Sequence, residues 1–339
     1  MEKLQQNINS AMAKRSSQYQ QISLNKIKTI SILSRKSKVQ PKDFAHTFDT
    51  DSDSFDAFLQ SFPNILMSEK LHEFVLHVVN ARKNNYPVIM MMGAHIIKTG
   101  LSPLVIDLIQ LGIITAVAMN SAAAIHDVET AIWGQTSEDV AVNLLDGTFG
   151  MSKETGEFIN GVLNENFTNS EFGYGESLGN SLMKIKAKNL RYSILANCVM
   201  GKIPVTVHAA IGTDIIHQQP TMNGAATGEM SFRDFKIFAN TVKELTGGGV
   251  VMNWGSAVIL PEIFLKALTI VRNLGYKANG FTTANFDMNA HYRPLQNVVQ
   301  RPTQDGGQGY YFIGHHEIMF PLVSAMIKQK YNVQRRKRK

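Results

Sequence analysis

The sequence predicts an α/β protein with a doubly wound, mainly parallel sheet of about six strands, helices on both faces and a helical N-terminal extension. Two observations support this fold class. Short, continuously apolar runs alternate with helix-length amphipathic segments along most of the chain, and several of these runs end in glycine, small or polar residues. Continuous apolar runs are typical of strands buried on both faces, and their alternation with helices is typical of parallel sheets.

The clearest βαβ unit follows a helix predicted over residues 69–83, for which Ser68 is a good N-cap. The next predicted elements are a strand at 87–92, a loop at 93–100, a helix at 102–111 with Pro103 in its first turn, and a strand at 113–119. A strand, a helix and a second strand in this order form a βαβ unit and indicate a parallel sheet.

The same alternation continues to the end of the chain. Further elements are predicted as a helix at 152–163, a loop or lid at 164–179, a long helix at 178–200, a strand at 204–208, a helix at 233–245 capped by Ser231 with Asp234 as its capping-box partner, strands at 250–251, 281–285 and 310–313, and a helix at 260–274.

Charge separates the chain into three parts. Residues 1–40 hold eight lysines and arginines against Glu2 alone, and residues 328–339 hold seven and no acid, so the intervening body is acidic. We predict a flexible basic arm at 1–26, a single domain at 27–328 and a basic tail at 329–339. An acidic body argues against a nucleic-acid-binding core.

No apolar run is long enough to predict a transmembrane helix, so no membrane is expected as a partner. The single cysteine, Cys198, cannot form an intramolecular disulfide and is interpreted as a core residue. This favours a reducing, cytoplasmic compartment, although the basic start of the chain also fits a mitochondrial transit segment.

A glycine-rich stretch, Thr246–Ala257, joins a predicted helix to a short β-branched pair. Glycine lets a phosphate approach backbone N–H groups, so Gly248 and Gly249 are predicted to contact a cofactor. The alternative is a turn that serves packing alone.

Polar residues follow the predicted strands, and the carboxyl ends of parallel strands share one edge, so these residues are expected to converge. They include six of the ten histidines. The set is His95, Lys98, Asn120, Ser121, His126, Asp127, His208, Thr213, Asp214, Asn253, Ser256, Asn285, Asp287, His291, Arg293, His315, His316 and Glu317. The usual dinucleotide fingerprint, the P-loop, the hydrolase elbow and the HExxH motif are not in the sequence.

The order of several motifs resembles that of the deoxyhypusine synthase family over residues 88–328. The motifs are Ser102…Asp107 leading to Asn120-Ser-Ala-Ala, Pro204-Val-Thr-Val…Thr213-Asp214, Gly247-Gly-Gly-Val-Val251, Thr283-Ala284 before Asp287, and Phe320-Pro-Leu-Val323. The resemblance implies a Rossmann-like domain that binds NAD without the usual fingerprint, in a tetramer with sites at subunit interfaces. Members of this family oxidise spermidine and move an aminobutyl group onto a lysine of a translation factor, and related bacterial proteins use amines and small acceptors.

The resemblance also assigns residues. Those along the dinucleotide would be Asn120, Ser121, Ala122, Thr213, Asp214, Thr283, Ala284 and Asp287. Asn253 takes the place of the family's active-site histidine, and His126 and Asp127 fall where acidic residues meet the polyamine. The family's Trp-Gly-Lys run is replaced by Val298–Thr303, and residues 278–327 hold no lysine. Because an arginine cannot form the covalent imine, transfer to a protein lysine is not expected.

The leading hypothesis is an NAD-dependent enzyme that acts by hydride transfer on a small substrate, including an amine. His208 or His126 would take the proton, and Asp127 or Asp214 would orient that histidine or hold the substrate amine. Asn253 would donate a hydrogen bond. Further substrate contacts are predicted for Ser256, His291, Arg293, His316 and Glu317. A homo-oligomer, dimer or tetramer, is expected.

Two alternatives belong to other classes. One is metal-assisted hydrolysis or deamination, with His126, His315, His316 and Glu317 near a divalent ion. The other is a catalytically silent structural or regulatory homologue, which the missing lysine favours.

Overall fold

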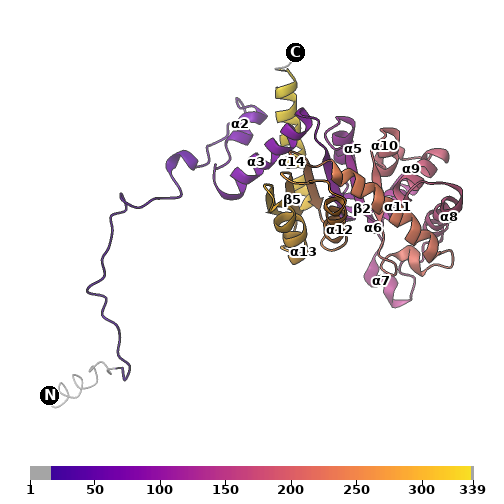
Figure 1. Ribbon diagram of the computed structural model, residues 1–339, viewed down its shortest axis with the longest axis horizontal. Helices are drawn as coiled ribbons and strands as arrows, with labels where there is room; N and C mark the ends of the chain where they lie inside the picture. The colour runs from indigo at the N-terminus through magenta and orange to yellow at the C-terminus, as the bar shows by residue number, and fades with distance from the viewer. Residues whose placement is uncertain (1–16, 337–339) are drawn as a thin grey trace. The chain divides into compact units, whose positions relative to one another are not determined.

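The computed structural model describes residues 17–336 (Figure 1), and the chain divides after Asp43 into two units. The described part of the first unit is irregular backbone with one 3-10 turn, η1 (Pro41–Asp43). The second unit contains the sheet. None of the helices within residues 17–336 combines the length and apolar character needed to cross a bilayer.

In the part of the chain that the structure describes, six strands form one sheet in which every neighbouring pair is parallel. They are β1 (Val88–Met92), β2 (Ala116–Asn120), β3 (Val205–His208), β4 (Val250–Trp254), β5 (Thr282–Asp287) and β6 (Gln308–Ile313). Their order in the sheet is β3-β2-β1-β4-β5-β6. Strands β2 and β3 are added on one side of β1, and β4, β5 and β6 are added on the other side. This confirms the predicted doubly wound α/β fold and defines a topological switch point at the β1–β4 boundary.

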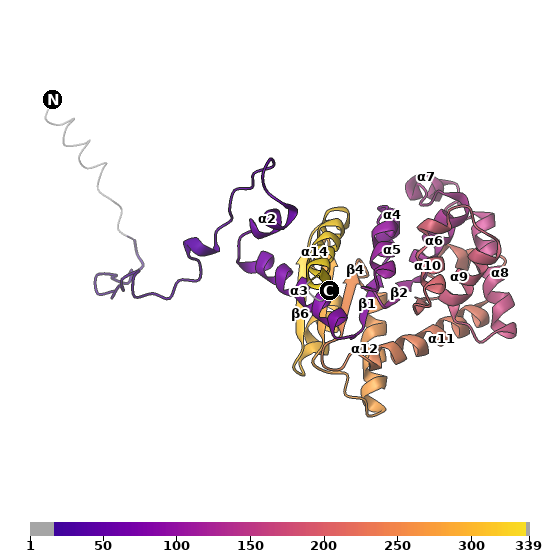
Figure 2. The same ribbon diagram turned by 90° about the horizontal axis from the view of Figure 1, so that it is seen from above.

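The strands read as continuous apolar runs because both faces of the sheet are covered. Successive side chains of β1 point to opposite faces, so Met90 lies in one core and Met91 in the other. The larger core holds α3 (Leu66–Lys83), α5 (Ser102–Gln110), α6 (Ser121–Trp133) and α14 (His316–Arg336). The second core holds α11 (Gly224–Lys243) and α12 (Ile259–Asn273), and Figure 2 shows α12 and α14 on opposite sides of the strands.

The remaining helices are shorter or lie beyond β2 and β3. They are α2 (Phe55–Gln60), α4 (His95–Lys98), α7 (Val140–Leu145), α8 (Lys153–Asn169), α9 (Tyr174–Lys184), α10 (Ile194–Met200) and α13 (Tyr292–Pro294). Helices α2 and α3 precede β1 and supply the expected N-terminal helical elaboration. Cys198 is fully buried, as predicted.

Two predicted elements between β2 and β3 are wrong. The lid at 164–179 does not exist, because α8 continues to Asn169 and α9 begins at Tyr174. The long helix at 178–200 is two helices, since Ser193 caps α10 by accepting a hydrogen bond from the Ala196 N–H. The polar residues on the exposed face of these helices resemble the composition of a loop, which explains the difference.

Other boundaries also differ. The loop predicted at 93–100 contains α4, and β2 begins at Ala116 rather than at 113. Helix α11 begins nine residues before the predicted start at 233, because Asn223 caps it. Ser231 therefore lies inside the helix, where its hydroxyl accepts from the Ala209 N–H at 3.0 Å.

Asp234, predicted as a capping residue, instead joins α11 to β3 and α9. Its buried carboxyl group accepts hydrogen bonds from the N–H groups of Val207, at 2.6 Å, and Gly175, at 2.9 Å. Burial raises the pKa of Asp234 to about 8, although these hydrogen bonds oppose the increase. The folded protein therefore favours the protonated acid at this position.

The triple glycine lies at the amino end of β4, on the edge of the sheet opposite the strand carboxyl ends. A Cβ atom on Gly248 would lie 2.7 Å from the ring of Tyr86, and one on Gly249 would overlap Leu245. The packing interpretation of this stretch fits the structure. The cofactor contact of Gly248 and Gly249 stays a prediction, and Gly248 lines a small cavity of about 300 Å³ at this edge.

Replacing Gly248 by alanine should destabilise the protein by about 1–3 kcal/mol, because the added methyl group overlaps the Tyr86 ring. The control is Gly161→Ala in α8, where a Cβ meets no neighbour and stability should rise by about 0.5–1 kcal/mol. Urea unfolding measures both changes. Unchanged stability of Gly248→Ala combined with loss of dinucleotide binding would support the cofactor role.

Asp234 should make stability depend on pH. Its folded pKa of about 8 lies above the ordinary aspartate pKa of 3.8, so the folded state holds the extra proton between these values. The free energy of unfolding should therefore fall as pH rises from about 4 to about 8, by at most about 1.4 kcal/mol per pH unit. Asp234→Asn cannot titrate and should flatten this part of the profile. An identical profile in the variant would contradict the assignment.

Candidate functional site

A cavity of about 640 Å³ opens beyond the carboxyl ends of β2 and β3. Its walls come from α4, α6, the segment 135–140, the start of α8 and the loop before η3 (Ile215–Gln218). Four carboxylates line it against a single lysine. These charged residues are Glu129, Glu138, Glu154, Asp214 and Lys98. The cavity is therefore electronegative when His126, on the same wall, is neutral.

Helix α6 supplies one wall of the cavity because of where β2 ends. The side chain of Asn120 accepts a hydrogen bond from the Ala123 N–H at 2.9 Å and starts the helix directly after the strand. Residues spaced three or four apart then face the cavity. They are Ala122, Ile125, His126, Glu129 and Trp133.

A hydrogen-bonded chain connects His126 to Glu129 through Thr136. His126 Nδ1 lies 2.6 Å from Thr136 Oγ1, and the Thr136 hydroxyl donates to Glu129 Oε2. Thr155 donates to the other carboxylate oxygen at 3.0 Å. Burial acts to raise the pKa of Glu129, but the nearby His126 imidazole and the hydrogen bonds from Thr136 and Thr155 outweigh it and hold the pKa below its usual value.

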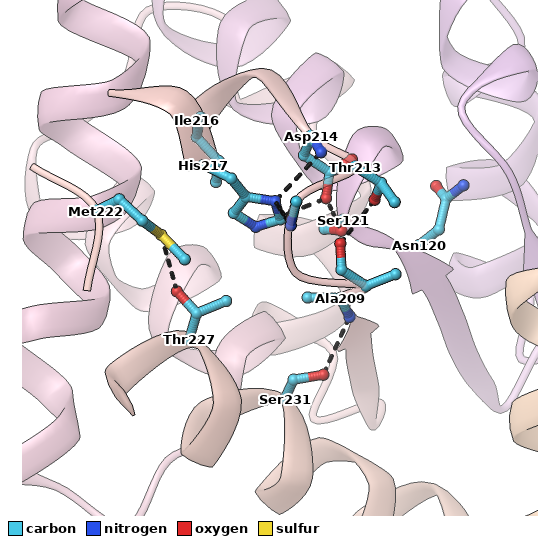
Figure 3. Close-up of polar contacts among 12 residues, drawn as sticks. Asn120, Ser121, Ala209, Thr213, Asp214, Ile216, His217, Met222, Thr227 and Ser231 are labelled. Carbon is cyan, nitrogen blue, oxygen red and sulfur yellow. Dashed lines mark hydrogen bonds and ion pairs between the residues drawn. The ribbon is translucent and has the colours of Figure 1, made fainter. Parts of the chain in front are cut away.

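Asp214 forms the opposite side of the cavity. The Ser121 hydroxyl donates to its Oδ2 atom, which joins the start of α6 to the segment after β3 (Figure 3). The N–H groups of Asp214 and Gly212 both donate to His217 Nδ1 at 3.2 Å. Burial raises the pKa of Asp214, against the effects of Ser121, His217 and His126.

The structure thus brings part of the predicted site together. Ala122, His126, Thr213 and Asp214 all line the cavity, and Ser121 contacts Asp214 directly. These residues come from segments about ninety positions apart, and the parallel sheet places both segments at the same edge.

Two predicted catalytic residues do not face the cavity. His208 is buried against Phe238 on the α11 side of the sheet, with Nε2 3.0 Å from Thr206 Oγ1, and burial lowers its pKa to about 3. Asp127 is also buried and accepts from the Ser193 hydroxyl and the Ile194 N–H, at 2.5 and 2.7 Å. Burial raises the pKa of Asp127 to about 6. Both side chains are used inside the fold, which does not support catalytic roles.

Another group of predicted residues lies inside β4, β5 and the start of α12. Asn253 Nδ2 donates to Asn285 Oδ1 at 2.6 Å and to the Ser256 carbonyl at 2.8 Å. The Ser256 hydroxyl accepts a hydrogen bond from the Leu260 N–H in the first turn of α12. Thr283 and Ala284 are buried in the middle of β5 rather than at its end. These positions do not fit the predicted cofactor and substrate contacts.

A second polar group lies at the ends of β5 and β6. His291 Nε2 is 3.5 Å from Asp287 Oδ1, and the buried His316 ring lies over Gly255. His316 Nδ1 has no hydrogen-bond partner in the described chain, and burial lowers the pKa of this histidine. Helix α4 connects the two groups, because His95 packs near His316 and Lys98 lines the cavity.

The other predicted substrate residues are engaged at the surface. Arg293 forms an ion pair with Glu262 at 3.4 Å, and Glu317 forms one with His315 at 3.7 Å if that histidine is protonated. Within residues 17–336, no group of three or more histidine, cysteine, aspartate or glutamate residues could hold a metal ion. The structure therefore does not gather the ligands that the metal alternative requires.

Several residues that line the cavity were not predicted from the sequence. They are Glu129, Trp133, Thr136, Glu138 and Thr155. His217 was not predicted either; it does not line the cavity but accepts from the backbone N–H of Asp214, which does. Glu129 and Trp133 lie three and seven positions after His126, so a helical-face pattern starting at His126 was the available signal. Thr136 and Glu138 lie in a segment for which no element was predicted.

Comparison with solved structures reports on the fold. A candidate deoxyhypusine synthase from Entamoeba histolytica is similar with a TM-score of 0.51 at 10% identity, over 83% of this chain and 96% of that one. AgrE in its ternary complex with ornithine and NAD⁺ is similar with a TM-score of 0.50 at 12% identity, over 76% of this chain. The cyanobacterial arginine dihydrolase ArgZ gives a TM-score of 0.47 at 15% identity, over 78% of this chain.

The chain spans about a third of the length of these last two proteins, 32% of AgrE and 33% of ArgZ. No protein-family model matches the sequence, and no curated protein matches it either. The strand order and the cavity at the carboxyl edge define a Rossmann-like α/β protein. More particularly, the chain has a deoxyhypusine synthase-like fold.

Asp127→Ala should lower the free energy of unfolding by at least about 2 kcal/mol, because it leaves buried donors at the start of α10 without an acceptor. Asp107→Ala is the matched control. Asp107 pairs with Lys328 at the surface, so its loss should cost less than about 1 kcal/mol. Chemical denaturation measures both. Equal small effects for the two variants would return Asp127 to the list of candidate catalytic groups.

Proposed function

We propose that the protein is an NAD-dependent enzyme that binds a small amine in the acidic cavity and acts on it by hydride transfer. The observation that carries this proposal is the cavity itself, in which four carboxylates and one lysine lie directly beside the N-terminus of α6. In the proposal the cavity provides a cation site and a phosphate site side by side, at the sheet edge where α/β proteins bind ligands.

The lining suits an ammonium group on an aliphatic chain. Asp214 and Glu138 provide negative charge, while Trp133 and Phe149 provide apolar surface and a π-face for a cation. Glu129 adds a carboxylate that its hydrogen bonds hold in the ionised form. A similar combination of ligands occurs in one structural neighbour, since AgrE was crystallised with ornithine and NAD⁺.

The start of α6 fits a dinucleotide phosphate. The first N–H groups of a helix lack intrahelical acceptors, and Asn120 satisfies the one at Ala123. The N–H groups of Ser121 and Ala122 remain for a phosphate, beside small side chains that allow close approach. In the proposal Asn120, Ser121, Ala122 and Thr213 hold NAD. When bound, NAD supplies the hydride acceptor.

The protein's own groups would hold the substrate and move its proton. Asp214 attracts the ammonium group, and His126 accepts a proton from it. Transfer to a protein lysine is not part of the proposal, because the region of the missing lysine forms η4 (Leu295–Gln300) and η5 (Arg301–Thr303), where Arg301 bonds to Asn297 at 2.8 Å. A homo-oligomer and a cytoplasmic location belong to the same proposal.

Calorimetry with NAD, and then with a series of diamines and amino acids bearing a side-chain amine, tests the proposal on the purified full chain. NAD should bind at millimolar concentration or below, and NADH formation should follow addition of a matching amine. Asp214→Asn should weaken amine binding at least about tenfold, because a hydrogen-bonded charge contributes about 1.5–3 kcal/mol. The control is Glu244→Gln. Glu244 is exposed at the C-terminal end of α11 and does not line the cavity, so this variant should bind amines normally.

Failure to bind both NAD and every amine at millimolar concentration would overturn the enzymatic proposal. That result would favour the silent structural or regulatory homologue. Binding of NAD with no effect of Asp214→Asn on amines would instead place the substrate elsewhere.

A further inference from the structure

We propose that Glu129 and Thr136 are positioning residues that fix the tautomer of His126, so that its Nδ1 atom carries the proton and its Nε2 atom presents a lone pair to the cavity. This inference rests on the proposed function only for the identity of the proton donor, a substrate ammonium group. The tautomer itself follows from hydrogen bonds on α6 and the segment after it.

The three side chains form a continuous and mostly enclosed chain of contacts. His126 and Glu129 are one helical turn apart on α6, and their side chains are 16% and 13% exposed. Thr136 follows α6 and lies between them, 2.6 Å from His126 Nδ1 and in a hydrogen bond to Glu129 Oε2. Direct contact between the imidazole and the carboxylate is longer, at 3.7 Å.

The donors and acceptors in this series of hydrogen bonds can be assigned by starting from Glu129. Glu129 has a lowered pKa, so its carboxylate is ionised near neutral pH and can only accept. The Thr136 hydroxyl has one hydrogen and gives it to Glu129. Thr136 Oγ1 can then only accept from His126, so Nδ1 must carry a hydrogen. In a neutral imidazole the other nitrogen, Nε2, is therefore the acceptor.

The far end of the chain is anchored as well. Thr155 donates to Glu129 Oε1 at 3.0 Å, and its own oxygen lies 3.0 Å from the Ser152 hydroxyl. Both carboxylate oxygens thus have fixed partners, which prevents Glu129 from turning away from Thr136. A neutral histidine in water has no such constraint, so the tautomer is a property that the fold imposes.

The consequence for the reaction is a proton transfer with a defined direction. An N–H bond of the substrate ammonium breaks, its electron pair stays on the amine nitrogen, and the proton forms a bond to Nε2. His126 then carries a positive charge, which Glu129 stabilises through Thr136, and Asp214 faces the same imidazole across the cavity. A bare Nε2 is the form that can accept this proton at once.

Nitrogen NMR of the full-length protein labelled with ¹⁵N-histidine reads the tautomer without any need for activity. The spectra are recorded about two pH units above the ordinary histidine pKa of about 6.5, where imidazoles are neutral. His126→Asn assigns the His126 signals by their disappearance. In the wild type, Nδ1 should show the shift of a protonated nitrogen and Nε2 that of an unprotonated one.

Two substitutions separate the hydroxyl from the bulk of the threonine side chain. Thr136→Val keeps the shape and removes the hydroxyl, so the Nδ1–H preference should be lost and the two nitrogens should move towards mixed values. Thr136→Ser keeps the hydroxyl and should retain the wild-type pattern. Thr241→Val is the control, since the Thr241 hydroxyl bonds to the Ile237 carbonyl on α11, away from the cavity.

A wild-type spectrum with the proton on Nε2, or a Thr136→Val spectrum identical to the wild type, would overturn the inference. Either result leaves the proposed function intact, because NAD and amine binding are measured separately. Where amine oxidation is observed, Thr136→Val should lower kcat several-fold with little change in KM, because only part of the His126 population then has the competent tautomer, and Thr136→Ser should retain most of the wild-type kcat. A rise in KM alone would indicate a purely structural role.

Discussion

The parallel direction of all six strands is the constraint on which the rest of the structure depends. Because every strand runs the same way, every loop that follows a strand leaves from the same edge of the sheet. This brings Ser121, at the end of β2, into contact with Asp214, beyond β3 and 93 residues away in sequence. The cavity between these loops exists because the two connections finish side by side.

Burial then decides which polar residues remain available to a ligand. A buried polar group is costly without a partner, so Asp127, Asp234 and Asn253 are engaged with backbone or neighbouring side chains. Each holds two elements together rather than facing a cavity. The carboxylates that line the cavity differ because part of each remains accessible from it, and their negative charge gives the cavity its preference for cations.

The sequence predicted the fold class because β1 and β4 are buried on both faces, which produces continuous apolar runs. It placed Asn120, Ser121, His126 and Asp214 at the sheet edge for the same reason. It could not distinguish Asp127 from His126, since only the docking of α10 shows that the aspartate faces inward. The role of Thr136 could not be predicted from the sequence either, because its contacts with His126 and Glu129 depend on the turn that follows α6.

The measurement that tests the central claim most directly is hydrogen exchange of backbone amides with and without NAD and a bound amine. Ligand should slow exchange at the start of α6 and in the segments around Thr136 and Asp214, which together enclose the cavity. Protection at the triple glycine before β4, on the opposite edge of the sheet, would contradict the assignment of the site.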